Sequence, residues 1–357
     1  MRADRRRFLR LGLGVAAGVV GGPVDRRAHG GPAPLGLDPR ERHLRNLRQL
    51  TAGGQNAEAY FDWTGTRLVF QSTRPPFACD QIFTMGVDGT EVRQVSTGKG
   101  RTTCAFFFPD GRRVIYASTH LAGDACPAPP DRSAGYVWPL YPAYDIFAAD
   151  LDAGVLTRLT RTEGYDAEGA VSPDGTRIVF TSVRDGDLEL YLMDADGGNV
   201  RRLTDRVGYD GGAFFSWDGR FIVYRAATPA GEAERDEYRR LLGQGLVRPS
   251  RLEIFVMRPD GTGVTQVTRN GAANFAPFLH PDSRRVIFAS NLHDPTGRTF
   301  ALYLVNADGS ALERVTWSES FASFPMFSRD GKQLAFCGNR NAQAPREMNV
   351  FIADWVD

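Results

Sequence analysis

The sequence lacks the short motifs that mark many enzymes and cofactor-binding proteins. No GxSxG nucleophile turn, HExxH zinc helix, GxGxxG dinucleotide turn or phosphate-binding P-loop occurs among its 357 residues. Histidine is also scarce, with five in the chain. We therefore expect no cofactor, and the sequence gives no direct support for an enzyme.

An excess of positive charge is missing as well. The chain has 43 Lys and Arg residues against 42 Asp and Glu residues. Without residues 1–29 these counts fall to 36 and 40, which leaves a net charge near −4. Binding to phosphate backbones requires a basic surface, so neither nucleic acid nor an anionic membrane surface is an expected partner.

A hydrophobic run long enough to span a membrane is also lacking. The apolar stretch from Leu11 to Val20 has ten residues, whereas a spanning helix needs about 20. The stretch follows Arg5-Arg6-Arg7-Phe8-Leu9-Arg10, which resembles the twin-arginine export motif. We interpret residues 1–29 as a signal peptide and expect a periplasmic or secreted protein with no membrane span after cleavage. The alternative is a basic amphipathic arm on a cytoplasmic protein.

What the sequence does contain is one pattern that returns six times after residue 55. Each unit has a tight turn between two β-rich strands, then a third strand, and in five units an acidic hairpin turn and a strand ending in Leu-Thr, Val-Thr or Val-Ser. The first turns are Trp63-Thr64-Gly65, Pro109-Asp110-Gly111, Pro173-Asp174-Gly175, Trp217-Asp218-Gly219, Pro281-Asp282-Ser283 and Arg329-Asp330-Gly331. Four antiparallel strands repeated six times predict an all-β, six-bladed β-propeller over residues 45–357.

The last repeat ends at Asp357 without its fourth strand. Leu50-Thr51, near the start of the chain, has the missing Leu-Thr ending. We expect this N-terminal segment to supply the outer strand of the sixth blade, after a linker over residues 30–44. A ring closed in this way leaves no open sheet edge, and we expect a monomer.

The Pro-Asp-Gly turn, the Ser-x-Arg after the second strand, the Asp-Gly hairpin and the Leu-Thr ending resemble TolB-type propeller repeats. The resemblance covers residues 45–357, but no room is left for the N-terminal α/β domain of TolB, so its role in the Tol–Pal system is not carried over. Related repeats occur in prolyl-oligopeptidase-type propellers and oligogalacturonate lyases. A histidine metal centre like that of the lyases is not expected, because His280 falls on the opposite rim from His120.

Candidate binding residues lie on the rim where the repeats diverge. The position eight residues before the turn is polar in five units, including Asp166, Asp210 and Asn274. The loops facing it begin with Arg74, His120, Arg184 and Arg340. Arginine near a carboxylate favours bidentate pairing. Alternatively, these side chains join neighbouring strands by hydrogen bonds.

Two similar segments, 164–168 and 208–212, bring further candidates to this rim: Tyr165, Asp166, Glu168, Tyr209 and Asp210. Carboxylates and aromatic rings in one place suit a peptide or a sugar. A divalent cation at Asp166 and Asp210 is a second interpretation, but no calcium-binding loop supports it. We assign no metal site.

The second and fourth units each carry an insertion of about twenty residues between their second and third strands. The first, residues 121–143, is rich in proline and contains Tyr136, Trp138 and Tyr141. The second, residues 229–251, predicts one short helix. Insertions of this size usually carry function. Cys79 and Cys126 belong to loops of the same rim, so we expect a disulfide between them, with Cys104 as an alternative partner.

We therefore expect an exported, non-catalytic binding or scaffold protein of the cell envelope. Its rim would capture a protein partner or an envelope polymer, either a polysaccharide or a peptide. The alternative is a hydrolase or lyase that uses Asp166, Glu168 or Asp210 as acid or base at the channel mouth. A purely structural spacer is a third interpretation.

Overall fold

The structure is a computed structural model that describes residues 32, 34–133, 135–318 and 320–357. The predicted signal peptide, residues 1–29, lies outside the described residues. Within the described ranges, no helix is both long and apolar enough to cross a membrane.

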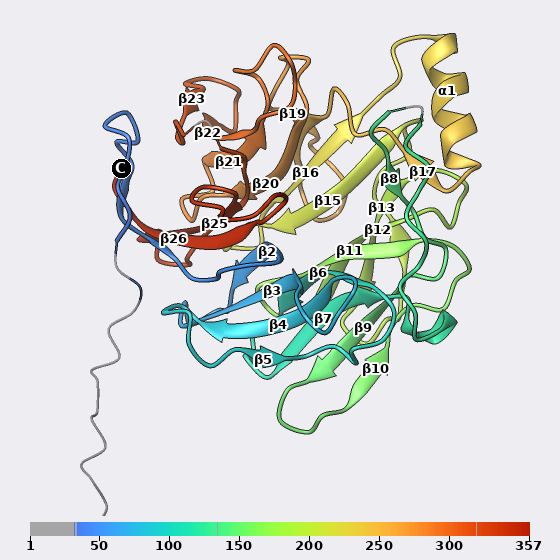
Figure 1. Ribbon diagram of the computed structural model, residues 1–357. Coiled ribbons are helices and arrows are strands. Elements are labelled where there is room, and N and C mark those ends of the chain that lie inside the picture. Colours follow the sequence, from blue (N-terminus) through green and yellow to red (C-terminus); the bar gives the residue numbers. More distant parts are fainter. Residues whose placement is uncertain (1–31, 33, 134, 319) are drawn as a thin grey trace, which may run out of the picture. The chain divides into compact units, whose positions relative to one another are not determined.

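Six four-stranded antiparallel sheets stand around a central axis (Figure 1). The predicted six-bladed propeller is therefore confirmed. The innermost strands are β2 (Gln55–Phe61), β6 (Thr102–Phe107), β11 (Asp166–Val171), β15 (Tyr209–Phe215), β20 (Asn274–Leu279) and β24 (Ala322–Phe327). The second strands are β3 (Arg67–Thr73), β7 (Arg113–Ser118), β12 (Arg177–Ser182), β16 (Ile222–Ala227), β21 (Arg285–Ser290) and β25 (Gln333–Gly338).

The two outer strands of each blade complete the sheets. The third strands are β4 (Gln81–Gly86), β9 (Asp145–Asp150), β13 (Glu189–Asp194), β18 (Glu253–Met257), β22 (Ala301–Asn306) and β26 (Asn349–Trp355). The fourth strands are β5 (Arg93–Gln94), β10 (Leu156–Arg158), β14 (Arg201–Arg202), β19 (Thr265–Gln266), β23 (Glu313–Arg314) and β1 (Leu44–Gln49). The hydrophobic core lies between the faces of neighbouring blades, where large rings such as Phe70, Phe180 and Phe288 are completely buried.

The repeated sequence signatures correspond to repeated contacts. The turn between the first two strands needs a left-handed residue, which is glycine in five blades; Ser283 takes the same conformation in the fifth blade, with a φ of 56°. The Ser or Thr that ends each repeat accepts the backbone N–H of the second residue of the third strand, at 2.9 Å in every blade. These bonds are Ile82 to Ser96, Ile146 to Thr160, Leu190 to Thr204, Ile254 to Thr268, Leu302 to Thr316 and Val350 to Thr51.

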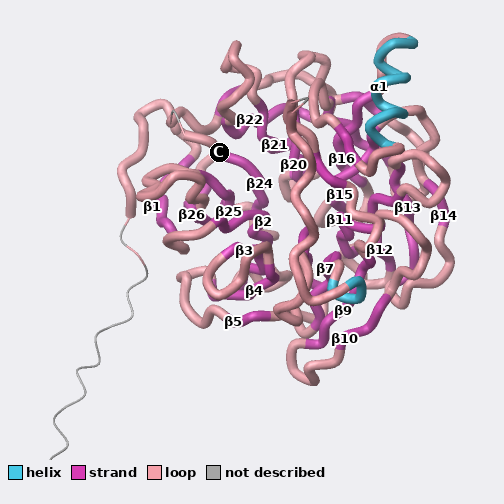
Figure 2. Tube along the Cα trace, turned by 45° about the vertical axis from the view of Figure 1, so that its right-hand side comes forward, coloured by secondary structure: helices cyan, strands magenta, loops and turns pink. Residues whose placement is uncertain are grey.

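The last of these bonds shows how the ring closes. Strand β1 pairs antiparallel with β26, so that the two ends of the chain share the sixth blade. Both views show β1 beside β26 (Figures 1 and 2). The predicted closure by an N-terminal strand is confirmed.

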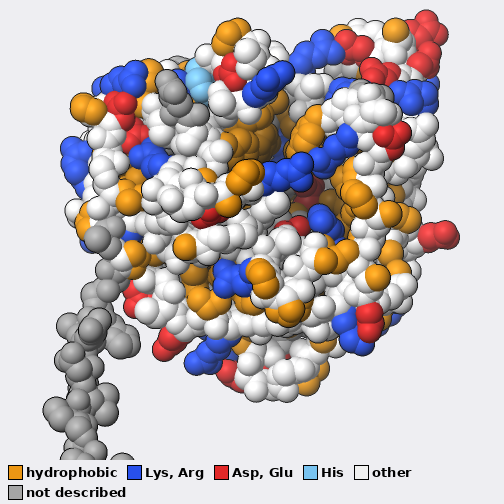
Figure 3. All heavy atoms as spheres, viewed as in Figure 1, with side chains coloured by type: hydrophobic (Ala, Val, Ile, Leu, Met, Phe, Trp, Pro, Cys, Tyr) orange, Lys and Arg blue, Asp and Glu red, His pale blue; other side chains and the backbone are white. Residues whose placement is uncertain are grey.

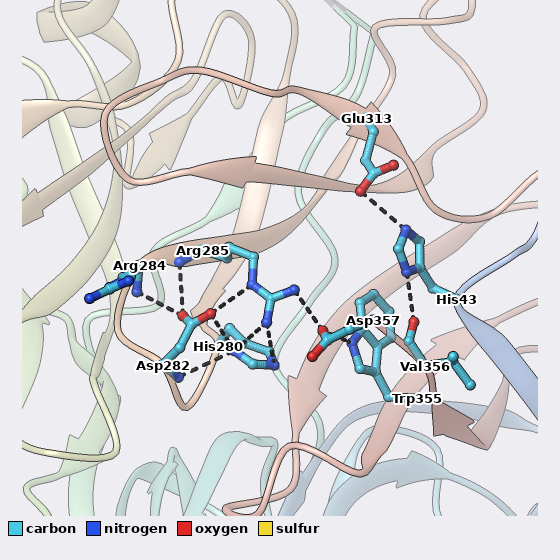
Figure 4. A network of polar contacts seen from close by, with 9 residues as sticks. All are labelled: His43, His280, Asp282, Arg284, Arg285, Glu313, Trp355, Val356 and Asp357. Carbon is cyan, nitrogen blue, oxygen red and sulfur yellow. Dashed lines mark hydrogen bonds and ion pairs between the residues drawn. The ribbon is translucent and has the colours of Figure 1, made fainter.

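The segment before β1 is fastened to the propeller. Glu41 is completely buried and forms an ion pair with Arg340. Figure 4 shows His43 between the carbonyl oxygen of Val356, at 2.8 Å, and Glu313, at 3.1 Å. In the same view Arg285 joins the C-terminal residue Asp357 to the turn at Asp282. The second half of the predicted linker is thus docked against the blades.

The two insertions meet above one rim. The first contains β8 (Trp138–Pro139) and the second contains β17 (Leu246–Val247), and these two short strands pair antiparallel. The second insertion also forms the predicted helix, α1 (Glu232–Leu242), and the first begins with a 3-10 turn at His120–Ala122. Cys79 and Cys126 form a disulfide, with their Cα atoms 6.0 Å apart, which ties the first insertion to blade one.

Candidate functional site

A cavity of about 950 Å³ opens at the rim that carries the insertions. All six blades and both insertions contribute to its lining. Figure 3 shows a hollow on this face, with hydrophobic side chains on its walls and Lys or Arg side chains at its edge. Its aromatic lining residues are Tyr60, Tyr136, Trp138, Tyr141, Tyr144, Tyr165, Tyr209, Phe214, Phe275, Phe300, Phe321 and Phe324.

The paired strands β8 and β17 place Trp138 over the cavity. The ring of Trp138 lies edge-on to Tyr209 and to Phe275, with centroids 6.2 and 6.3 Å away. The guanidinium of Arg225 lies 5.1 Å from the centroid of the Trp138 ring, within the range of a cation–π interaction. The first insertion is therefore part of the binding cavity.

A β-bulge in every innermost strand shapes the deeper part of the cavity. The bulge shifts the register of all six pairs of first and second strands. One residue in each bulge has a positive φ, between 51° and 58°, and lines the cavity: Glu58, Cys104, Glu168, Gly212, Ala276 and Phe324. This bulge ring carries two carboxylates, Glu58 and Glu168, and two small residues, Gly212 and Ala276.

Glu168 is held in a polar cluster. It forms an ion pair with Arg225, and it accepts hydrogen bonds from the Thr181 hydroxyl at 2.7 Å and the Gly212 N–H at 2.9 Å. Arg225 also donates to the Tyr209 hydroxyl, at 2.9 Å through Nε. A Cβ on residue 212 would collide with the guanidinium, so glycine is required there by Arg225. Burial raises the pKa of Tyr209 well above its usual value, so this phenol stays neutral.

Glu58 is different from Glu168, although it occupies the same position in the first repeat. The pKa of Glu58 is raised to about 7, mainly by burial and also by the charges of Glu168 and Asp80, against the lowering effects of Cys104 and Arg225. Burial likewise raises the pKa of the Cys104 thiol well above its usual range, so the thiol stays protonated and is a poor nucleophile. A carboxyl that gains or loses its proton near neutral pH therefore lies inside an aromatic cavity.

The structure brings together six of the candidates chosen from the sequence. These six candidates line the cavity: Tyr136, Trp138, Tyr141, Tyr165, Glu168 and Tyr209.

The other candidates lie within and between the blades. Asp166 is 1% exposed. Its two carboxylate oxygens accept hydrogen bonds from Nη2 of Arg184, at 2.9 and 3.1 Å. Arg74 donates to Asn56, and Asn274 accepts a bond from Ser290 at 2.7 Å.

The remaining three candidates also contact protein groups. The His120 ring hydrogen-bonds to Ser118, and Arg340 pairs with Glu41. Asp210 is 3% exposed and lies beside Glu189. Among the described residues, no group of three or more His, Cys, Asp and Glu side chains is placed to hold a metal ion.

Sequence reasoning missed Glu58, Cys104 and Arg225. Glu58 and Cys104 stand six residues before the first-turn position of their repeats, two residues after the column that was taken as the rim. That column reads Glu, Cys, Glu, Gly, Ala and Phe along the chain. This position varies in chemical type while the rest of the repeat is regular. That variation is the signal that would have identified the bulge ring.

Comparisons with known proteins agree with this architecture. The family model described as "TolB beta propeller domain" matches residues 142–234. An uncharacterized protein of Agrobacterium fabrum is 44% identical over 48 residues, which is 13% of this chain and 16% of that protein. The match therefore spans a small part of either protein.

Solved structures resemble the chain over most of its length. A putative TolB from Agrobacterium tumefaciens superimposes with a TM-score of 0.58 at 18% identity, covering 85% of this chain and 91% of that chain. TolB from Acinetobacter baumannii gives 0.55 at 17% identity, covering 84% and 63%. Oligogalacturonate lyase from Vibrio parahaemolyticus gives 0.52 at 13% identity, covering 86% and 93%.

Identities this low show a shared fold and carry no activity with them. The family match falls on repeats that the sequence pattern defines, and two of the similar structures are a TolB and a putative TolB. The chain has a β-propeller fold, and residues 142–234 match the model of the TolB propeller domain.

Proposed function

We propose that the protein is an exported binding protein of the cell envelope that holds a segment of a peptide or glycan in its rim cavity. The aromatic cavity of about 950 Å³ is the observation that carries the proposal. Its volume lies in the upper part of the range of small-molecule sites, roughly 300–1,000 Å³. Such a space admits a few residues or sugar units, but not a folded domain.

The chemistry of the lining fits this type of ligand. Aromatic rings bury the apolar faces of sugars and side chains, and a few polar groups then fix the orientation. Here Glu58, Glu168 and Arg225 supply the polar groups. The Cys79–Cys126 disulfide supports export, because disulfides persist in oxidising compartments.

The test uses separate glycan and peptide digests of the cell envelope, with binding measured by native mass spectrometry and calorimetry. We expect the purified protein to bind components of one digest, and Trp138→Ala to weaken binding at least tenfold by removing the ring over the cavity. The matched control is Trp317→Ala, because Trp317 lies outside the cavity between Arg40 and Arg314. Unchanged binding by Trp138→Ala, or no binding from either digest, would overturn the proposal.

A hydrolase or lyase remains the second candidate, now centred on a different residue. Asp166 and Asp210 lie within the blades, whereas Glu58 lines the cavity and its pKa of about 7 suits a general acid or base. Shortened products in the digests after incubation would favour this candidate over simple binding.

A further inference from the structure

Two glutamates at equivalent positions of the bulge ring differ in their partners. Glu58 belongs to the first repeat and Glu168 to the third, and both line the cavity with a positive φ. Three groups hold Glu168 by short contacts, the Arg225 guanidinium, the Thr181 hydroxyl and the Gly212 N–H, and the Tyr209 hydroxyl lies further away at 3.4 Å. The same three places around Glu58 show what the first repeat lacks.

The residue equivalent to Thr181 in the first repeat is Gln71, whose side-chain oxygen bonds to the second blade instead of donating to Glu58. Its Oε1 accepts the backbone N–H of Cys104 and the Thr103 hydroxyl, both at 3.1 Å. The Cys104 N–H corresponds to the Gly212 N–H that Glu168 uses, so this donor is already occupied. Among the residues that the structure describes, Glu58 forms no ion pair, and its hydrogen-bonding neighbour is the Cys104 thiol.

Arg225 shows how this cavity holds a cation. Its guanidinium lies 5.1 Å from the centroid of Trp138 and 5.5 Å from that of Tyr209, and it pairs with Glu168. A carboxylate and aromatic faces together stabilise a desolvated cation. The cavity wall also has aromatic pairs from several blades. Tyr60, two residues after Glu58 on the same strand, lies 5.1 Å from Phe214, and Phe324 of the neighbouring sixth blade lies 6.1 Å from Phe275.

We propose that the cavity recognises a cationic nitrogen of its ligand, a primary ammonium or a guanidinium, which binds the Glu58 carboxylate among the aromatic rings. The inference rests on the proposed function and specifies its ligand class. The ligand nitrogen would take the role at Glu58 that Arg225 has at Glu168. Peptides with a free amino group or a basic side chain, and glycans with an unacetylated amino sugar, carry such a nitrogen.

Three arginines besides Arg225 line the cavity; Arg101 and Arg251 are in ion pairs, whereas Arg298 forms none among the described residues. Arg101 pairs with Asp80 at 3.2 Å, and Arg251 pairs with Glu234. The titratable or charged groups that face Glu58 are Cys104, Cys337, Glu168, Arg225, Asp80 and Tyr60. With Cys104 and Tyr60 neutral because burial raises the pKa of both, an ionised Glu58 leaves the cluster with an excess of negative charge.

The experiment compares 4-phenylbutylamine with 4-phenylbutanol, two probes of equal length that differ in charge. We expect the wild-type protein to bind the amine at least tenfold more tightly at pH 8, and Glu58→Gln to bind both probes equally. At pH 6 amine binding should release a proton from Glu58, measured by calorimetry in buffers of different ionisation enthalpy. Glu91→Gln, an exposed glutamate outside the cavity, is the matched control and should keep the preference.

Each other outcome overturns the inference. Equal affinity of the wild-type protein for both probes shows a cavity that binds ligands without selecting a cation, so the proposed function survives and the inference fails. A preference that persists in Glu58→Gln places the cation elsewhere. Binding of neither probe also overturns the inference, whereas the proposed function is judged separately by the envelope digests and Trp138→Ala.

Discussion

At the scale of single residues, the buried carboxyl groups of Glu189 and Asp210 lie together between the third and fourth blades. Glu189 pairs with Arg202, yet its Oε2 is buried without a donor among the described residues. Burial and the charge of Glu189 raise the pKa of Asp210 well above its usual value. A protonated Asp210 would donate to this oxygen, so one proton is shared by the pair.

This arrangement predicts how stability depends on pH. The pKa of Asp210 is higher in the folded than in the unfolded protein, so the unfolded state loses its proton first as pH rises. The free energy of unfolding therefore falls as pH rises from the pKa of the unfolded state towards the pKa of the folded state. The Asp210→Asn variant has an amide N–H that can donate a hydrogen bond to Oε2 of Glu189, but it has no proton that titrates. We expect it to unfold at a higher temperature than the wild type at pH 8, with a smaller difference at pH 4, as measured by calorimetry. A stability difference independent of pH would contradict the shared proton.

The sequence predicted which residue types would gather near the rim, but not which of them would face the cavity. Asp166 and Arg184 are both candidate binding residues by sequence, and the structure pairs them with each other. The innermost strand contains a bulge, so counting residues from the turn does not tell which side chains point inward. Arg225 reaches the cavity because residue 212 is glycine, and that contact between two strands is not visible in either strand alone.

At the scale of elements, the repeat was the most informative signal. Strand order, hairpin turns and the Leu-Thr endings follow from local chemistry that recurs six times, so their positions could be predicted. The pairing of β8 with β17 could not, because it joins two insertions that are far apart in sequence and have no repeat to define their register. The shared rim was predicted, and the cavity between the insertions was not.

The disulfide that anchors the first insertion leads to a prediction at this scale. Cys79 and Cys126 are separated by 47 residues, and a crosslink of this size restricts the unfolded chain, which typically contributes about 2–4 kcal/mol. We expect Cys79→Ser with Cys126→Ser to lower the unfolding free energy by this amount in urea titrations. Reductant should reproduce the loss in the wild type and have no effect on the double variant. Equal stability with and without reductant would show that the bridge is absent in solution.

At the scale of the whole molecule, stability depends on the closure of the ring. Strand β1 places Leu44 and Leu47, both completely buried, against the sixth blade. Glu41 neutralises Arg340, and removing one partner of a buried ion pair costs about 3–5 kcal/mol. Each buried leucine adds roughly 1.5–3 kcal/mol. Together these terms are comparable to the total stability of a typical domain, about 5–15 kcal/mol.

Shortening the chain tests this closure. A chain that begins at Ala52 lacks β1 and Glu41, which leaves β26 as an open edge and Arg340 buried without its partner. We expect it to aggregate, or to lose the near-ultraviolet circular dichroism of packed aromatic rings, because an unpaired edge strand recruits other chains. A chain that begins at Pro32 keeps every contact described above and should remain a monomer in light scattering with one cooperative unfolding transition. If the shorter chain were equally stable and monomeric, five complete blades would suffice for folding, and the strand exchange between the two ends would have no role in stability.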